Sequence, residues 1–296
     1  MNVTSVPLMK NLARIVALFS ALIMILALYE PYAPRDSYTV AKNGVYIQNS
    51  ASPIEYLIEE RLAQAALLLD ATEGRILFSQ NASARLPMAS TTKIMTAIVA
   101  IENMPTDYVV TVAKEAVGIE GSSIYLYAGE QITCLDLLYG LMLESGNDAA
   151  AALAIAVGGT EERFIMLMNE KAKELGLKDT RFSNPHGLPA GNHFTSAADL
   201  ARLTDYALQN ELFAEIVSTK KMAACEGARY FVNHNRLLFS YEGMIGVKTG
   251  YTQASGRCLV TAARRYGRTL ICVTLNDYYC SADHVRMLDS GFSSTD

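Results

Sequence analysis

A serine and a lysine three residues apart open an apolar stretch in the segment LPMASTTKIMTAIVA. These residues, Ser90 and Lys93, share one face if the segment is a helix, so the amine can reach the hydroxyl. A serine hydroxyl becomes a nucleophile when a neighbouring base takes its proton, and lysine is such a base only where burial or another cation lowers its pKa. The apolar neighbours Ile94, Met95 and Ile98 favour burial. The pair therefore has the chemistry of an acyl-transfer site.

Two later motifs change how this pair is interpreted. Taken alone, it is better explained as an N-cap serine followed by a solvated lysine. However, ESGNDAA places Ser145 and Asn147 in a short break between two helical stretches. GVKTGYT then ends an apolar strand with Lys248, Thr249 and Gly250. In this order, S-x-x-K, S-x-N and K-T-G form the motif set of penicillin-interacting serine enzymes.

The chain resembles the serine-type D-alanyl-D-alanine carboxypeptidases, the low-molecular-mass penicillin-binding proteins, over about residues 60–292. Beyond the three motifs, the resemblance rests on the stretches GSSIYLYAGEQIT, FSNPHGL, NHNRLL and DHVRMLDSGF. It implies an enzyme that removes the terminal D-Ala from peptidoglycan stem pentapeptides ending in D-Ala-D-Ala. It also implies an acyl-enzyme intermediate, covalent inhibition by β-lactams, and no need for a cofactor or metal.

The resemblance assigns catalytic roles to particular residues. Ser90 attacks the carbonyl of the penultimate D-Ala, and Lys93 accepts its proton. Ser145 relays a proton to the leaving amine, with the charge of Lys248 nearby. The backbone N–H groups of Ser90 and Tyr251 form the oxyanion hole, where such donors contribute a few kcal/mol each, on the order of 3.

Substrate binding is assigned in the same way. Asn147 hydrogen-bonds the peptide backbone, and Lys248 with Thr249 receives the terminal carboxylate. Gly250 lets the peptide approach closely enough to pair alongside the strand. Some members add an arginine just after the last strand to bind the carboxylate. The corresponding stretch here, NDYYCSAD at 276–283, holds no arginine, which puts that contact in doubt.

Hydrophobic periodicity predicts the elements that position these residues. Strands early and late in the chain, with helices between them, indicate an α+β fold. We expect an antiparallel sheet flanked by helices, an inserted helical lobe, and a site in the cleft between them. Strands are predicted at 65–70, 75–80, 244–250, 257–264 and 269–275, and helices at 90–103, 133–144, 147–157, 161–176, 196–210 and 282–292.

The N-terminus has the layout of an export signal. Lys10 and Arg14 precede an apolar run that ends at Tyr29, and no acid appears before Glu30. The run suits either a signal peptide or an uncleaved anchor, with a slight preference for the anchor. The catalytic part is therefore expected outside the cytoplasm, with membrane contact only through this segment. The predicted divisions are a signal peptide or anchor at 1–36, a linker at 37–59 and a DD-carboxypeptidase domain at 60–296.

Composition excludes other classes of partner. The net charge is −5 with both signs dispersed, which argues against nucleic acid. Five cysteines form no C-x-x-C, and small buried hydrophobes are favoured over a disulfide framework. A tight turn near Tyr266–Gly267 places Cys272 opposite Thr261 rather than Cys258 on the paired strand.

Histidine and tyrosine residues offer weaker signals. The four histidines show no metal-ligand spacing, so a zinc peptidase is disfavoured and His186 is expected to order its loop. Tyr125 and Tyr127 could line the cleft, but their alternation favours half-buried packing.

Two other functions compete with carboxypeptidase activity. A β-lactamase is disfavoured because 158–243 holds no E-x-x-x-N stretch and S-G-N replaces S-D-N. A catalytically silent wall-binding or scaffold protein on the same fold is disfavoured because Ser90, Lys93 and Lys248 are all present.

Overall fold

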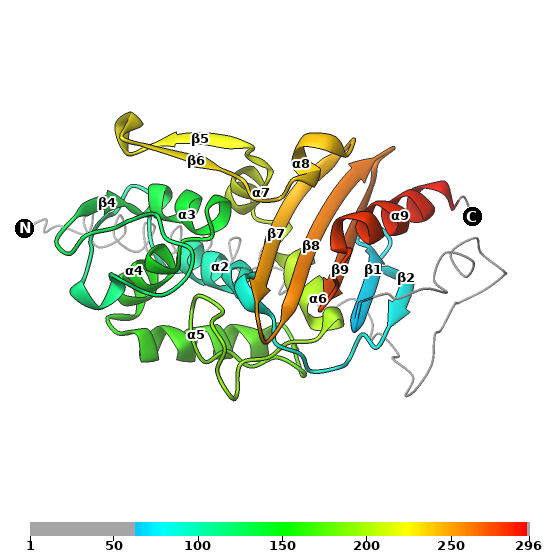
Figure 1. The fold of residues 1–296 in the computed structure, drawn as a ribbon, viewed down its shortest axis with the longest axis horizontal. Helices are drawn as coiled ribbons and strands as arrows, with labels where there is room; N and C mark the ends of the chain where they lie inside the picture. The colour runs from blue at the N-terminus through cyan, green and yellow to red at the C-terminus, as the bar shows by residue number, and fades with distance from the viewer. Residues whose placement is uncertain (1–62, 295–296) are drawn as a thin grey trace, which may run out of the picture. The chain divides into compact units, whose positions relative to one another are not determined.

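The computed structural model describes residues 63–294, and the fold there is α+β, as predicted. Its centre is an antiparallel sheet with the strand order β2-β1-β9-β8-β7 (Figure 1). The predicted signal or anchor at 1–36 and the linker at 37–59 lie outside the described residues. The strands of the sheet are β1 (Ala65–Asp70), β2 (Arg75–Gln80), β7 (Met244–Thr252), β8 (Gly256–Arg265) and β9 (Arg268–Leu275).

The middle strands of the sheet are covered on both faces. Every residue of β1 is buried, as are most residues of β8 and β9. This explains why these strands are almost continuously apolar rather than alternating. Figure 1 shows α9 (Cys280–Ser293) in front of the sheet, and α6 (Ala197–Leu208) packs against β1 and β9. The strand β7 has no neighbour on its outer side among the described strands, so its edge is available for pairing.

Helix α9 is fixed to the sheet by a buried histidine. His284 Nδ1 lies 2.7 Å from Thr261 Oγ1, and its Nε2 lies 3.1 Å from Thr274 Oγ1. Burial lowers the pKa of His284 to about 3, so the ring is neutral at physiological pH. The pairing of Thr261 with Cys272 confirms the predicted register.

The middle of the chain forms the helical lobe, with two small hairpins. The hairpins pair β3 (Val109–Thr111) with β4 (Gln131–Thr133), and β5 (Lys221–Ala224) with β6 (Arg229–Val232). Neither hairpin was predicted, nor was α7. The remaining helices are α2 (Lys93–Asn103), α3 (Cys134–Leu143), α4 (Asn147–Gly158), α5 (Glu161–Glu174), α7 (Glu211–Ser218) and α8 (Leu237–Ser240), with 3-10 turns η2 (Ala89–Thr92), η3 (Lys114–Ala116) and η4 (Cys225–Gly227).

The helices differ in whether a side chain caps their first turn. The helices α3, α5 and α6 begin at Thr133, Thr160 and Ser196, whose hydroxyls accept backbone N–H groups. The helices α2 and α4 have no side-chain cap at all. These two helices carry Lys93 and Asn147 of the S-x-x-K and S-x-N motifs, and α8 and α9 likewise have no side-chain cap.

Two expectations about side chains have different outcomes. All five cysteines are free, and Cys134, Cys258 and Cys272 are buried as small hydrophobes. The half-buried packing expected for Tyr125 and Tyr127 is wrong: they are 86% and 64% exposed. Within residues 63–294, no helix has the length and apolar character needed to cross a bilayer.

Candidate active site

Ser90 lies in the 3-10 turn η2, immediately before the α-helix that begins at Lys93. The predicted helix at 90–103 therefore starts with a tighter turn. Within it, Lys93 Nζ lies 3.0 Å from Ser90 Oγ. Ala89 has a positive φ of 47°, and its carbonyl lies so close to Gly187 that a Cβ there would be 2.0 Å away. A side chain at position 187 would displace the turn that holds the nucleophile.

The Lys93 amine is fully buried, with three oxygen partners. Besides Ser90, it contacts Asn147 Oδ1 at 2.7 Å and the His186 carbonyl at 2.6 Å. Burial and the charge of Lys248 lower the pKa of Lys93 well below its usual range, against an opposing effect of Asp148. A neutral amine has two N–H donors and one lone pair. Since the amide and carbonyl oxygens only accept, they take the donors, and the lone pair remains for the Ser90 proton.

Asn147 has a fixed side-chain orientation. Its Nδ2 donates to the Glu120 carbonyl at 2.5 Å, which directs Oδ1 toward Lys93. Its backbone N–H donates to the Ser122 carbonyl at 2.7 Å. The loop at 120–122 therefore holds the start of α4 in place of a capping side chain.

Ser145 and Lys248 are both buried near this pair. Ser145 adopts a positive φ of 62° between α3 and α4, and no hydrogen bond within residues 63–294 uses its hydroxyl. Lys248 Nζ donates to the Thr249 carbonyl at 3.1 Å. Burial lowers the pKa of Lys248 to about 7, although the charge of Glu144 raises it. Lys248 is thus only partly protonated at neutral pH.

Strand β7 passes directly against the nucleophile turn at Gly250. A Cβ on Gly250 would lie 3.0 Å from both the Ser90 nitrogen and the Ala89 Cβ. The absence of a side chain is therefore required for this approach. The next residue on the strand is Tyr251, whose side chain is 66% exposed.

The structure brings five of the predicted site residues together by different means. Hydrogen bonds join Ser90, Lys93 and Asn147, and close packing joins Gly250 to Ser90. Lys248 is close enough for its charge to lower the pKa of Lys93. Ser145, Thr249 and Tyr251 adjoin these residues along the chain, and no side-chain contact joins them to Ser90 among the described hydrogen bonds.

His193 supports the nucleophile turn and was not predicted to do so. Its Nδ1 accepts the Ser183 N–H at 3.0 Å, so the ring proton is on Nε2. That nitrogen lies 2.7 Å from Thr92 Oγ1, which donates to the Ala89 carbonyl at 2.7 Å. Burial and the charge of Lys93 lower the pKa of His193 to about 4, which keeps the ring neutral. A histidine in a polar loop gives no sequence signal for this tether.

His186 orders its loop, as predicted. Its Nδ1 accepts the Leu188 N–H at 3.2 Å, while its carbonyl binds Lys93. Residues 63–294 contain no group of three or more histidine, cysteine or acidic residues that could hold a metal ion.

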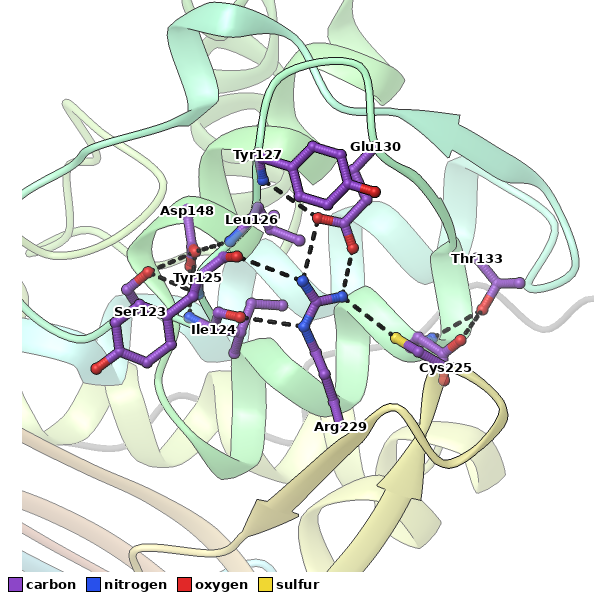
Figure 2. A network of polar contacts seen from close by, with 11 residues as sticks. Ser123, Ile124, Tyr125, Leu126, Tyr127, Glu130, Thr133, Asp148, Cys225 and Arg229 are labelled. Atoms are coloured by element: carbon purple, nitrogen blue, oxygen red, sulfur yellow. Dashed lines mark hydrogen bonds and ion pairs between the residues drawn. The ribbon is translucent and has the colours of Figure 1, made fainter.

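Asp148, next to Asn147, organises the loop at 120–130. Its buried carboxylate accepts backbone N–H groups of Ile124 and Leu126 and the hydroxyl of Ser123. Figure 2 shows these contacts beside a second group of interactions around Arg229. The role of this acid, one residue beyond the S-x-N motif, was not predicted.

Arg229, on β6, links the loop at 120–130 to the hairpin of β5 and β6. Its guanidinium forms a bidentate ion pair with Glu130, with one contact at 3.1 Å, and donates to the carbonyls of Ile124 and Tyr125 (Figure 2). Glu130 also accepts the Tyr127 N–H at 3.2 Å. The loop that holds Asn147 is therefore fixed at both ends.

A cavity of about 280 Å³ adjoins the nucleophile turn. No charged side chain lines it, and its walls come from the chain before Ser90, the loop after His186 and the turn after β7. The lining residues are Pro87, Met88, Ala89, Gly187, Leu188, Pro189, Ala190, Gly191, His193, Thr252 and Ala254.

The antiparallel sheet, the helical lobe and the Ser90–Lys93–Asn147 cluster agree with the resemblance to the low-molecular-mass penicillin-binding proteins. Residues 49–278 match the D-alanyl-D-alanine carboxypeptidase family (peptidase family S11), and the chain belongs to that family.

Among curated relatives, the chain is 36% identical over 242 residues to D-alanyl-D-alanine carboxypeptidase DacF of Bacillus subtilis. It is 38% identical over 240 residues to DacC of Escherichia coli. The matches cover 78% and 77% of this chain, but only 62% and 59% of those relatives. The crystal structure of the Streptomyces K15 DD-transpeptidase is similar, with a TM-score of 0.74 and 33% identity over 83% of this chain and 100% of that one.

Proposed function

We propose that this protein is a serine D-alanyl-D-alanine carboxypeptidase that removes the terminal D-Ala from peptidoglycan stem pentapeptides. The observation that carries the proposal is the buried Lys93 amine, placed 3.0 Å from Ser90 Oγ with its other contacts made to acceptor-only oxygens. A lysine in this setting is a base rather than a cation, because burial disfavours its charged form.

Acylation begins when Lys93 takes the Ser90 proton and Oγ attacks the carbonyl of the penultimate D-Ala. Negative charge then develops on the carbonyl oxygen. The N–H groups of Ser90 and Tyr251 stabilise this charge, supported by the close approach at Gly250. The peptide lies along the free edge of β7 as an added strand.

The tetrahedral intermediate collapses by protonating the leaving amine. Ser145, whose hydroxyl makes no other hydrogen bond within residues 63–294, relays the proton that Lys93 took from Ser90 to the D-Ala nitrogen, which leaves Lys93 neutral again. During this step Lys248 supplies positive charge near the leaving amine, and Asn147 binds the peptide backbone. Water then attacks the ester, with Lys93 again as the base, and releases the shortened peptide.

The uncharged cavity beside Ser90 accommodates the part of the stem peptide on the acyl side of the scissile bond. Its lack of charged lining suits backbone and aliphatic groups. β-Lactams occupy the same site, acylate Ser90 and remain bound. The N-terminal segment, a signal peptide or anchor at 1–36 followed by a linker at 37–59, places the domain at 60–296 in the cell envelope.

The test is D-Ala release from diacetyl-L-Lys-D-Ala-D-Ala by the unsubstituted protein and by Ser90→Ala. We expect steady release by the first and none above background by the second. Equal rates for the two proteins would show that Ser90 is not the nucleophile. A labelled penicillin should form a stoichiometric adduct with Ser90 that persists for minutes or longer. Turnover of many penicillin equivalents per second would instead identify a β-lactamase.

A further inference from the structure

The proposed substrate ends in a free carboxylate, and the site must recognise that charge beside Thr249. Lys248 is poorly suited to provide it alone, because its amine is buried, donates to the Thr249 carbonyl and is only partly protonated at neutral pH. The stretch that follows β9, residues 276–285, contains no lysine or arginine. A different cation is therefore needed on this side of the site.

The pairing of β7 with β8 places Arg257 next to the K-T-G strand. Thr249 pairs with Leu259, and Tyr251 pairs with Arg257. Residues directly opposite each other in an antiparallel pair share a face, as do residues two apart on one strand. The side chains of Thr249, Tyr251 and Arg257 therefore project from the same face. Thr249 and Arg257 are diagonal neighbours, about 7–8 Å apart, a span that a long side chain bridges.

The Arg257 side chain is exposed and has no partner of its own. No hydrogen bond or ion pair within residues 63–294 uses its guanidinium. Its backbone is fixed, because its carbonyl accepts the Asp277 N–H at 2.8 Å. This is the face covered further along by α9, and Cys280 at the start of α9 lies within reach of the Arg257 charge. The backbone of Arg257 is therefore fixed opposite the end of β7, and no described residue occupies its guanidinium.

We propose that Arg257 binds the C-terminal carboxylate of the substrate, together with the Thr249 hydroxyl, and determines the preference for peptides with a free C-terminus. This inference rests on the proposed function and assigns the carboxypeptidase selectivity of the site to a residue on β8. Arginine suits the role because its planar fork pairs with both oxygens of a carboxylate.

The experiment compares two substrates, diacetyl-L-Lys-D-Ala-D-Ala and its C-terminal amide, with Arg257→Gln, Arg257→Lys and the unsubstituted protein. For the free acid, Arg257→Gln should lower kcat/KM by about tenfold to a hundredfold, since a charge-assisted contact is lost. For the amide, the change should be less than about threefold, because the amide carries no charge for Arg257 to bind. Arg257→Lys should recover part of the loss for the free acid only.

Arg264→Gln is the matched control, since Arg264 lies on the same strand and, among the described residues, its side chain donates to Thr269 Oγ1 alone. It should leave the ratio of the two substrates unchanged. Equal losses for both substrates with Arg257→Gln, or no loss for either, would overturn the inference.

The two proposals fail in distinguishable ways. If the unsubstituted protein shows no Ser90-dependent D-Ala release, the proposed function fails. The role of Arg257 is then decided by Ser90 acylation with benzylpenicillin and with its methyl ester. A loss confined to the free carboxylate supports the role, and an equal effect on both, or no acylation by either, contradicts it.

Discussion

Asn147 Oδ1 lies 2.7 Å from Lys93 Nζ, and the opposite end of the same amide donates to the Glu120 carbonyl. This contact presents the lysine with an acceptor that carries no charge. The contact therefore orients the amine without stabilising its ammonium form. A carboxylate at this position would stabilise that form. An amide at position 147 therefore favours the neutral amine that the proposed role of Lys93 as a base requires.

Asn147→Asp should slow acylation of Ser90 at neutral pH by about tenfold or more. A carboxylate beside Lys93 raises the pKa of its amine and so retains its proton. The rate should recover as the pH rises, since the amine then loses its proton. The measurement is the second-order rate of labelling by a fluorescent penicillin across pH. Asn103→Asp, at the end of α2 and bonded to the Val99 carbonyl, makes the same change without contacting Lys93 and should keep the original profile.

Thr92→Val should weaken the turn that holds Ser90. The substitution preserves shape but leaves the buried His193 N–H unpaired and frees the Ala89 carbonyl. We expect about 1–3 kcal/mol lower free energy of unfolding and slower Ser90 acylation. Thr204→Val removes a buried hydroxyl that donates to the Leu200 carbonyl in α6, away from the site. If both variants lost acylation equally, the tether would have no specific effect on the nucleophile.

Lys248→Met should stabilise the fold while impairing acylation. Burial lowers the pKa of Lys248 from 10.5 to about 7, so below pH 7 the folded protein carries a buried charge that the unfolded chain exposes to water. The folded state releases this proton near pH 7, whereas the unfolded state retains it up to about pH 10. The stability gained by the substitution should be largest below pH 7 and should shrink as the pH rises toward 10.

Urea unfolding at several pH values measures this difference. Lys221→Met, which removes an exposed lysine on β5, controls for loss of charge and should show no comparable trend. A gain that grew between pH 7 and pH 10 would contradict the assigned direction of the Lys248 shift.

Arg229→Met should lower the free energy of unfolding by about 3 kcal/mol, because it leaves the largely buried Glu130 carboxylate without its partner. The loop at 120–130 should then hold Asn147 less firmly, which raises KM for the peptide. Combining Arg229→Met with Glu130→Leu should restore most of the stability. A double-mutant cycle measured by urea unfolding provides the check, and additive losses would show that the ion pair is not coupled.

The main elements of this fold are predictable because their apolar patterns are long and their partners are local. The turn at Tyr266–Gly267 joins adjacent strands, so the pairing of Thr261 with Cys272 follows from counting residues outward from it. The three motifs were identified by residue type and order, and the structure places Ser90, Lys93 and Asn147 in direct contact.

What the sequence did not reveal depends on contacts between distant residues. Tyr125 and Tyr127 alternate as strand residues do, but the backbone around them is held by Asp148 and Arg229 instead of a neighbouring strand. The rings consequently point to solvent. The hydrogen bond between His193 and Thr92 also joins residues far apart in sequence, and no sequence pattern at either position predicts it.

The main sheet joins the two ends of the described chain, since Ala65 of β1 pairs with Leu275 of β9. During synthesis, the hairpin of β1 and β2 emerges long before β9 exists, and a lone hairpin is marginally stable in water. Closure of the sheet therefore waits for the last strands, as expected for contacts of such large sequence separation. Because the K-T-G strand belongs to the same late segment, the proposed catalytic pocket cannot assemble before strands β7 to β9 have been synthesised.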